Sequence, residues 1–341
     1  MSTNTSNELP LVIGVDLGGT QIRTAVLHGP NMLSRVSSLI GKDPAPERII
    51  PHMFTTVEEA LEQAGTKLNQ IAGIGVATPG PLDYKTGVIL APPNLPGWER
   101  VPLRDLFIEH FHIPVFVEND AHTAGLGEYM FGAGRGCSNM VYLTISTGIG
   151  GGVIIDGKIV EGASGMAGEL GHMTIDWHGE RCNCGNIGCL EAIASGTGIA
   201  RKANKAIRSD EGIELLTFAR TLLEHSGEEE LHIGAHTVAL AAEAGVPLAR
   251  AIIQYAAEAI GVGLVNIIHC FNPEMIILGG GVAQMGPMLM EPALHVVQER
   301  AMKAPRASVR IVQAQLGASA GLIGAGALIY YRNDIVVGGL G

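Results

Sequence analysis

A cluster of sulfur and nitrogen ligands in the middle of the sequence is the first feature with a recognisable chemistry. Its members are His172, Cys182, Cys184 and Cys189. Three thiolates and one imidazole make a closed tetrahedral set for Zn²⁺, and a closed set leaves no open position for catalysis. Gly185 and Gly188 permit the tight turns that such short spacing needs. The pattern predicts a structural zinc site. His178 is a rival for the fourth ligand, and three buried thiols are the alternative interpretation.

Two carboxylates flank this cluster. Glu169 stands three residues before His172, and Glu191 stands two residues after Cys189. Closing a metal site would draw both carboxylates toward one place, where they could accept hydrogen bonds from hydroxyl groups. Taken alone, a carboxylate at either position would more commonly be a surface acid.

Asp120 is the candidate general base. It follows an apolar run at 115–117 and stands beside Asn119. A carboxylate at the end of a strand can accept the proton of an alcohol while that alcohol attacks phosphorus. The alternative is a helix N-cap, because helical spacing begins directly after this pair.

Three glycine-rich turns each follow an apolar run and could hold phosphate groups. The residues concerned are Asp16, Gly18, Gly19 and Thr20 in the first turn, Thr147, Gly148, Gly150 and Gly151 in the second, and Gly280 and Gly281 in the third. Backbone N–H groups at such turns bind phosphate oxygens, and a carboxylate such as that of Asp16 suits Mg²⁺. None of the turns reads GxxxxGK[ST], and none fits a dinucleotide-binding fold. One turn of this kind is commonly just a hairpin, whereas three favour a nucleotide.

The elements that must position these residues alternate between strands and helices. Strands are predicted at 11–15, 21–27, 71–77, 115–117, 140–146, 275–278 and 309–314, and helices at 56–69, 121–131, 288–302 and 318–331. This alternation favours an α/β protein with a mostly parallel sheet and additional hairpins. The strand–turn–strand pattern around Asp16 recurs around Thr147, which suggests an internal duplication. Two unrelated hairpins are the alternative.

Composition excludes several classes of protein. The chain has 341 residues, 47% of them hydrophobic and 16% charged, so it is not intrinsically disordered. Its net charge of −11 argues against a nucleic-acid surface. The uncharged stretches 137–155 and 312–331 are interrupted by small polar residues and glycine, so no membrane span is expected. Residues 1–10 lack a secretory pattern, and five cysteines with a thiolate cluster suit a reducing cytoplasm.

Taken together, these motifs resemble the ROK family of bacterial sugar kinases and sugar-responsive repressors. The matching segments are 16–20, 79–80, 94–98, 118–120, 146–152, 169–172, 182–191 and 278–282. They occur in the family's order and cover roughly positions 11 to 330. The cysteine motif with its preceding Glu-x-x-His is highly specific, while the glycine turns alone are not.

The resemblance implies an actin-like ATPase (ribonuclease H-like) fold, in which two α/β domains enclose a central cleft and a zinc knot supports the larger domain. The smaller domain would comprise residues 1–120 plus 320–341, and the larger one residues 121–319. The resemblance also implies that the sugar hydroxyls are held by Asn94, Asn119, Asp120, Glu169, His172 and Glu191. The implied reaction is transfer of a phosphoryl group from ATP, with Mg²⁺, to the 6-hydroxyl of a hexose, with Asp120 as base. A homodimer or homotetramer, with no nucleic acid or membrane as partner, is expected.

The segment 94–98 resembles the glucokinase branch, so glucose is the expected substrate. Mannose, fructose, N-acetylglucosamine and N-acetylmannosamine are alternatives, and polyphosphate remains open as a donor. Two local departures from the family are Gln21, where many relatives carry Lys, and His122, which replaces a small residue.

Two other classes of protein compete with a kinase. A sugar-responsive repressor of the same family would carry a DNA-binding domain before the first glycine turn, yet only fifteen residues precede Asp16. A polymerising actin-like ATPase would have no use for the zinc ligands or for the Asn119–Asp120 pair. A sugar kinase is therefore the preferred hypothesis.

Overall fold

The computed structural model describes residues 9–41, 43–92, 94–226, 231 and 233–335. The chain divides into two compact units. Unit 1 comprises Met1–Tyr142, Gly152–Gly168 and Ala314–Gly341, and unit 2 comprises Leu143–Gly151 and Glu169–Gln313. The chain therefore passes between the units four times. The domain division expected from the resemblance, 1–120 plus 320–341 and 121–319, stays a prediction.

The sheet of unit 1 has the strand order β3-β2-β1-β5-β8, with β4 also paired to β2. Its strands are β1 (Leu11–Leu17), β2 (Gln21–His28), β3 (Asn31–Met32), β4 (Val36–Leu39), β5 (Ile71–Thr78) and β8 (Val115–Asn119). Strands β1 and β2 form an antiparallel hairpin, and β5 runs parallel to both β1 and β8. Strands β6 (Leu82–Asp83) and β7 (Val88–Ile89) form a separate short hairpin.

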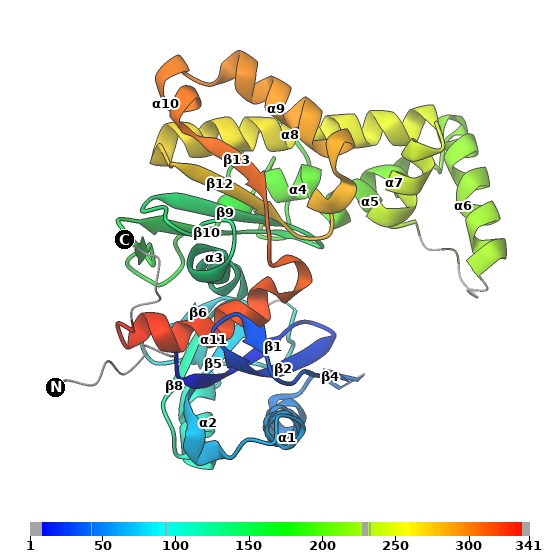
Figure 1. Cartoon of the computed structure of the whole chain (residues 1–341). Coiled ribbons are helices and arrows are strands. Elements are labelled where there is room, and N and C mark those ends of the chain that lie inside the picture. Colours follow the sequence, from blue (N-terminus) through cyan, green and yellow to red (C-terminus); the bar gives the residue numbers. More distant parts are fainter. Residues whose placement is uncertain (1–8, 42, 93, 227–230, 232, 336–341) are drawn as a thin grey trace. The chain divides into compact units, whose positions relative to one another are not determined.

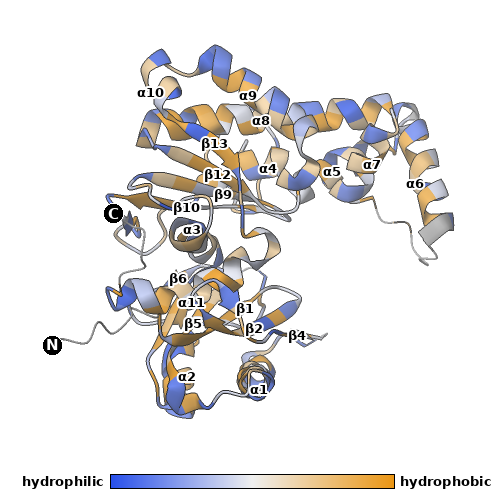
Figure 2. Cartoon of the chain, in the orientation of Figure 1, coloured by the Kyte–Doolittle hydropathy of each residue, from blue (hydrophilic) through white to orange (hydrophobic). Residues whose placement is uncertain are grey.

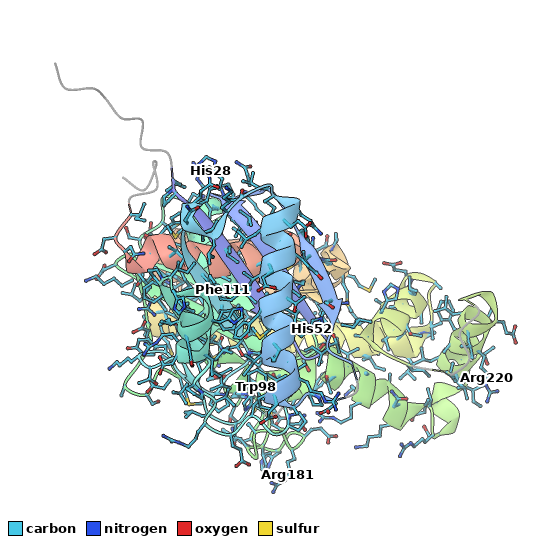
Figure 3. The ribbon with its side chains drawn as sticks, turned by 90° about the horizontal axis from the view of Figure 1, so that it is seen from below. His28, His52, Trp98, Phe111, Arg181 and Arg220 are labelled. Atoms are coloured by element: carbon cyan, nitrogen blue, oxygen red, sulfur yellow. The ribbon has the colours of Figure 1, made fainter. Side chains whose placement is uncertain are left out.

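Helices cover both faces of this sheet. Helices α1 (Pro46–Gln63) and α2 (Leu103–Phe111) lie on one face and α11 (Ala320–Arg332) on the other, with α3 (Asp120–Phe131) packed against α11 (Figure 1). Trp98 and Phe111 belong to the core beside α1 (Figure 3). The Trp98 indole N–H donates to the carbonyl oxygen of Pro44 at 2.7 Å, so this large side chain is buried without losing a hydrogen bond.

The helix predicted at 56–69 is observed at Pro46–Gln63, so its predicted bounds are wrong. Pro46 stands in the first turn, where a backbone N–H has no partner within the helix and its absence costs nothing. The helix also accommodates Pro51 in its interior. Leu68, inside the predicted range, lies in a 3₁₀ turn at Leu68–Gln70.

Helix α11 approaches its neighbours closely because glycine stands at the contacts. A Cβ atom on Gly75 of β5 would lie 1.7 Å from the carbonyl oxygen of Ala325 in α11. A Cβ atom on Gly324 of α11 would lie 1.7 Å from the carbonyl oxygen of Thr123 in α3. Neither position has room for a side chain, which explains the small residues of this last helix.

A second sheet has the order β11-β10-β9-β12-β13, in which β12 and β13 are parallel. Its strands are β9 (Met140–Ile145), β10 (Ile149–Ile155), β11 (Lys158–Ile159), β12 (Met275–Gly279) and β13 (Arg310–Gln313). Figure 2 shows apolar residues along much of β9 and β12. A two-residue hairpin turn joins β10 to β11, and its residues Asp156 and Gly157 both have positive φ angles, of 50° and 72°.

The helices of unit 2 are α4 (Leu190–Ala194), α5 (Gly196–Ala206), α6 (Ile213–Ser226), α7 (Ala235–Glu243), α8 (Pro247–Phe271), α9 (Pro287–Arg300) and α10 (Lys303–Ser308). Helix α8 packs along α7 and α9 (Figure 1). Within the described part of the chain, α8 is the one helix long and apolar enough to cross a membrane by length and composition. Because 67% of its most apolar window is buried inside the structure, α8 has the character of a core helix.

Candidate metal centre and neighbouring polar groups

The four predicted zinc ligands come together in unit 2. The ligand atoms of His172, Cys182, Cys184 and Cys189 all lie within 4.8 Å of one another. The Cys184 and Cys189 sulfurs are 3.7 Å apart, and the Cys182 sulfur lies 3.7 Å from Nδ1 of His172. The rival ligand His178 is not part of this group.

These distances fit a tetrahedral zinc ion. Two thiolates bound at about 2.3 Å to one tetrahedral ion are separated by roughly 3.8 Å, close to the spacing observed. Local backbone structure produces the arrangement: a 3₁₀ turn at Leu170–His172 presents the imidazole, and a β-bridge joins Thr174 to Cys189. Gly188 has φ of 68°, and a Cβ atom there would lie 1.5 Å from the carbonyl oxygen of Asp176, so this turn requires glycine. Arg181, just before the first cysteine, is exposed (Figure 3).

Glu169 and Glu191 both lie against this cluster. The Glu169 carboxylate is 3.8 Å from Nε2 of His172, so the imidazole faces the thiols with one nitrogen and a carboxylate with the other. Glu191, in the first turn of α4, lies 3.9 Å from the Cys182 sulfur. Its second oxygen accepts a hydrogen bond of 2.9 Å from the N–H of Ile149. The cluster therefore connects to the second glycine turn through Glu191.

The second and third glycine turns meet in unit 2. A Cβ atom on Gly280, whose φ is 87°, would lie 2.3 Å from the carbonyl oxygen of Ile145, where β9 ends and the second turn begins. The N–H of Val282 donates to that same carbonyl oxygen at 2.9 Å. At the start of α5, Gly196 donates to Ser146 at 2.7 Å. The structure thus gathers the predicted residues Thr147, Gly148, Gly150, Gly151, Gly280 and Gly281 at one end of the second sheet.

The first glycine turn lies in unit 1. Asp16, 4% exposed, pairs with Arg23 directly across the β1–β2 hairpin at 2.5 Å. Burial raises the pKa of Asp16, and Arg23 opposes that rise. The N–H of Gly18 donates to Gln21 within the turn, whereas Gly19 and Thr20 are exposed. Asn94 is also exposed, and its Cβ would lie 3.9 Å from a Cβ on Gly19.

Asn119 and Asp120 stand where β8 passes directly into α3. The side-chain oxygen of Asn119 caps the helix by accepting from the N–H groups of Ala121 and His122. The cap expected as an alternative role for Asp120 is therefore provided by Asn119. Asp120 is the first residue of α3, and it is exposed with one carboxylate oxygen 2.8 Å from the N–H of Ala121.

A buried charged cluster next to this pair was missed by the sequence analysis. Glu118 is 1% exposed and lies 3.0 Å from a guanidinium nitrogen of Arg332 and 3.2 Å from Nδ1 of His122. Arg332 also pairs with Glu161. The segment 118–120 was singled out as a motif and His122 as a departure, but no local pattern connects them to residues far along the chain.

Comparison with known proteins gives consistent matches over most of the chain. A family model described as the ROK family matches residues 12–331. A glucokinase of Halalkalibacterium halodurans is 35% identical over 324 residues, which cover 94% of this chain and 96% of that protein. A xylose repressor of Caldicellulosiruptor bescii is 33% identical over 321 residues, covering 93% of this chain and 77% of the repressor.

A solved structure extends the comparison to three dimensions. The ROK family glucokinase of Streptomyces griseus, in complex with glucose and AMPPNP, superimposes with a TM-score of 0.77 at 33% identity. The match covers 93% of this chain and 98% of that one. The predicted actin-like ATPase fold is confirmed by this similarity.

Proposed function

Because the chain belongs to the ROK family, we propose that it is an ATP-dependent hexokinase that phosphorylates the 6-hydroxyl of glucose. The observation that carries the proposal is the exposed carboxylate of Asp120, which follows the end of a buried strand and stands beside the capping Asn119. Similarity to a glucokinase and to a structure that holds glucose and an ATP analogue supports the substrate pair.

In the proposed reaction, Asp120 accepts the proton of the sugar hydroxyl while the hydroxyl oxygen attacks the γ-phosphorus of ATP. A new bond forms between that oxygen and phosphorus. The bond between the γ-phosphorus and its bridging oxygen breaks, and ADP leaves with the electron pair. An exposed carboxylate suits this role because a substrate can reach it.

The remaining predicted residues are assigned to binding. We assign the sugar hydroxyls to Asn94, Asn119, Glu169, His172 and Glu191, and the phosphates to the three glycine turns. Magnesium, when bound, neutralises charge on the β- and γ-phosphates, and Asp16 is the carboxylate proposed to hold it. The buried pair of Asp16 and Arg23 keeps that carboxylate in one orientation at the end of β1.

The cluster of His172, Cys182, Cys184 and Cys189 is proposed to hold a structural zinc ion. A bound metal fixes the orientation and tautomer of its histidine. In this chain Nε2 of His172 faces Glu169, and Glu191 lies beside the Cys182 sulfur, so the metal would orient three of the groups assigned to the sugar.

The substrate is tested by ADP release from ATP and magnesium with glucose, mannose, fructose, N-acetylglucosamine and N-acetylmannosamine, each with and without a zinc chelator. We expect a preference for glucose that is lost on removal of zinc. Faster ADP release with another sugar would support the mechanism and reject glucose as the substrate. No ADP release with any of the sugars would contradict the proposed kinase activity. The same assay with polyphosphate in place of ATP tests the donor.

A sugar-responsive repressor is the second candidate, because a xylose repressor is 33% identical to this chain. The net charge of −11 disfavours it, since binding to DNA phosphates relies on clustered basic residues. Titration of fluorescent duplex DNA at low salt distinguishes the two. Tight DNA binding without sugar-dependent ADP release would favour the repressor.

The proposal includes a cytoplasmic location and a homodimer or homotetramer. Sedimentation of the purified protein tests the assembly, and fractionation of the cells that produce it tests the location.

A further inference from the structure

One buried carboxylate organises the start of helix α3. Glu118 is 1% exposed and lies at the end of β8, immediately before Asn119. Its Oε1 accepts from the N–H of Asn119 at 2.9 Å and lies 3.2 Å from Nδ1 of His122. Its Oε2 accepts from Arg332 at 3.0 Å. A charge buried this deeply is stable only when its partners stay in place, so the loss of any of these contacts would be destabilising.

The same two partners, Arg332 and His122, also hold a loop far away in the sequence. We call residues 161–167 the clamped loop. At its first residue, Glu161 accepts from the same guanidinium nitrogen of Arg332 at 2.5 Å. At its last residue, the carbonyl oxygen of Ala167 lies 2.8 Å from Nε2 of His122. The N–H of Ala167 donates to the carbonyl oxygen of Glu161 at 3.1 Å, which closes the loop on itself.

Each carboxylate of this network faces nitrogen groups of its neighbours. Both ring nitrogens of His122 face acceptors, the Glu118 carboxylate and the Ala167 carbonyl, so this side chain connects Glu118 to the clamped loop. The Arg332 guanidinium pairs with the carboxylates of both Glu118 and Glu161. A polar network with all its partners in place holds one geometry, whereas a network that lacks a member leaves a buried charge uncompensated.

Tyr84 packs against the clamped loop and bonds to its first residue. A hydrogen bond to Glu161 raises the pKa of Tyr84 to about 12, because the phenol is retained as a donor. The Arg332 guanidinium lies 5.3 Å from the centre of the Tyr84 ring. A Cβ atom on Gly165, in the middle of the loop, would lie 2.7 Å from that ring, so the loop packs directly on it.

We propose that Arg332 and His122 are positioning residues for sugar phosphorylation: they hold Glu118, and hence the Asn119–Asp120 pair, and they clamp the loop that leads into Glu169. The inference rests on the proposed function. Neither residue is assigned to the substrate. Both act on residues that are, because Glu118 binds the N–H of Asn119 and the clamped loop ends two residues before Glu169.

The test compares Arg332→Met with Arg300→Met in the full-length protein. Arg300 is also the last residue of a helix and is exposed, so its replacement controls for loss of a helix-terminal cation. We expect Arg332→Met to lower kcat/KM for the sugar about 10- to 100-fold, since small displacements of reacting groups have effects of that size. We expect KM for ATP to stay within about twofold, because the network touches none of the glycine turns. Arg300→Met should behave like the wild type.

Rescue separates positioning from simple instability. One nitrogen of Arg332 makes both carboxylate contacts, so a lysine ammonium can replace it, and Arg332→Lys should recover most of the lost activity. Partial unfolding alone would lower the amount of active enzyme while leaving KM for the sugar unchanged.

A second variant reports on the loop without an activity measurement. His122→Asn removes the bond to Ala167, so amide hydrogen exchange should accelerate at residues 161–168 and 119–122 and remain unchanged in β12. Unaltered exchange at residues 161–168 and 119–122 would contradict the proposal that His122 holds the clamped loop. Unchanged sugar kinetics in Arg332→Met, against an active wild type, would overturn the positioning role alone. A wild type that phosphorylates no sugar would overturn the proposed function together with it.

Discussion

Asp120 is exposed, whereas Glu118, two residues earlier, is almost completely buried. The difference decides what each carboxylate can do. Glu118 is surrounded by fixed donors, and so is Glu128, which is 0% exposed and accepts from the N–H groups of Ala133, Gln315 and Leu316. A carboxylate held in this way is a structural group. Asp120, at the surface, can exchange its partners for a substrate.

At the residue scale, replacing Asp120 with asparagine tests the general base. Asp120→Asn keeps the shape of the side chain and removes its basicity, so turnover should fall about 10²- to 10⁴-fold. KM for the sugar should change little, because the amide can still bond to a hydroxyl. Steady-state kinetics with glucose and ATP measure both quantities.

Asp105→Asn is the matched control. Asp105 is likewise exposed in the first turn of a helix of unit 1, so its replacement removes the same favourable interaction with a helix N-terminus. Turnover in Asp105→Asn should equal that of the wild type. Equal turnover in both variants would remove Asp120 from the chemistry.

At the scale of structural elements, the proposed zinc site is tested through Cys184, its exposed cysteine. Cys184→Ser should lower zinc retention against a chelator and raise KM for the sugar, because His172 and Glu191 lose their common support. Elemental analysis of the dialysed protein measures the metal. Cys270→Ser, at an exposed cysteine outside the cluster, should retain about one zinc per chain. Full zinc retention in Cys184→Ser would contradict the ligand assignment.

The contact between β5 and α11 is tested by a single methyl group. Gly75→Ala would bring its Cβ against the Ala325 carbonyl, and overpacking of this kind costs about 1–3 kcal/mol of unfolding free energy. Gly281→Ala meets no atom within 4 Å and should stay within about 0.5 kcal/mol of the wild type. Urea denaturation measures both, and equal midpoints would show that α11 can shift away from β5.

Several elements were predictable because their signals are local. Apolar runs that end in glycine turns identified β1, β9 and β12, and the small-residue pattern identified α11. The Cys/His cluster was predictable because its four members lie within eighteen positions of one another. The start of α1 was missed, since two prolines mask the helical pattern there.

The network around Glu118 could not be predicted for a different reason. Its members stand at positions 118, 122, 161 and 332, and only the fold brings them together. A buried carboxylate has no local sequence signature, because its partners come from tertiary contacts. His122 was recognisable as unusual, yet its contacts with Glu118 and Ala167 arise only from the tertiary fold.

At the scale of the whole molecule, Tyr330 links stability to pH. Its hydroxyl donates to Pro10 at 2.8 Å and accepts from the N–H of Gly29, which joins α11 to residues next to β1 and β2. Burial raises the pKa of Tyr330 to about 12. Its pKa in the unfolded chain is about 10, so the folded state retains the proton to higher pH.

The resulting stabilisation is complete below about pH 10 and is lost as the pH rises toward 12, by about 3 kcal/mol in total. Tyr330→Phe should be less stable than the wild type at neutral pH and should lack this part of the alkaline decline. Urea denaturation at a series of pH values measures the difference. Parallel declines in the two proteins would contradict the buried phenol.

The four passages of the chain between units bear on the order in which the protein is made. Strands β1 and β5 leave the ribosome early, but α11, which covers one face of them, is synthesised only after the whole of unit 2. At about 5–20 residues per second, β8 and α11 are separated by about 10–40 s. Throughout that interval the nascent sheet presents an uncovered apolar face. We therefore expect this face, which α11 covers in the folded protein, to need a chaperone during translation.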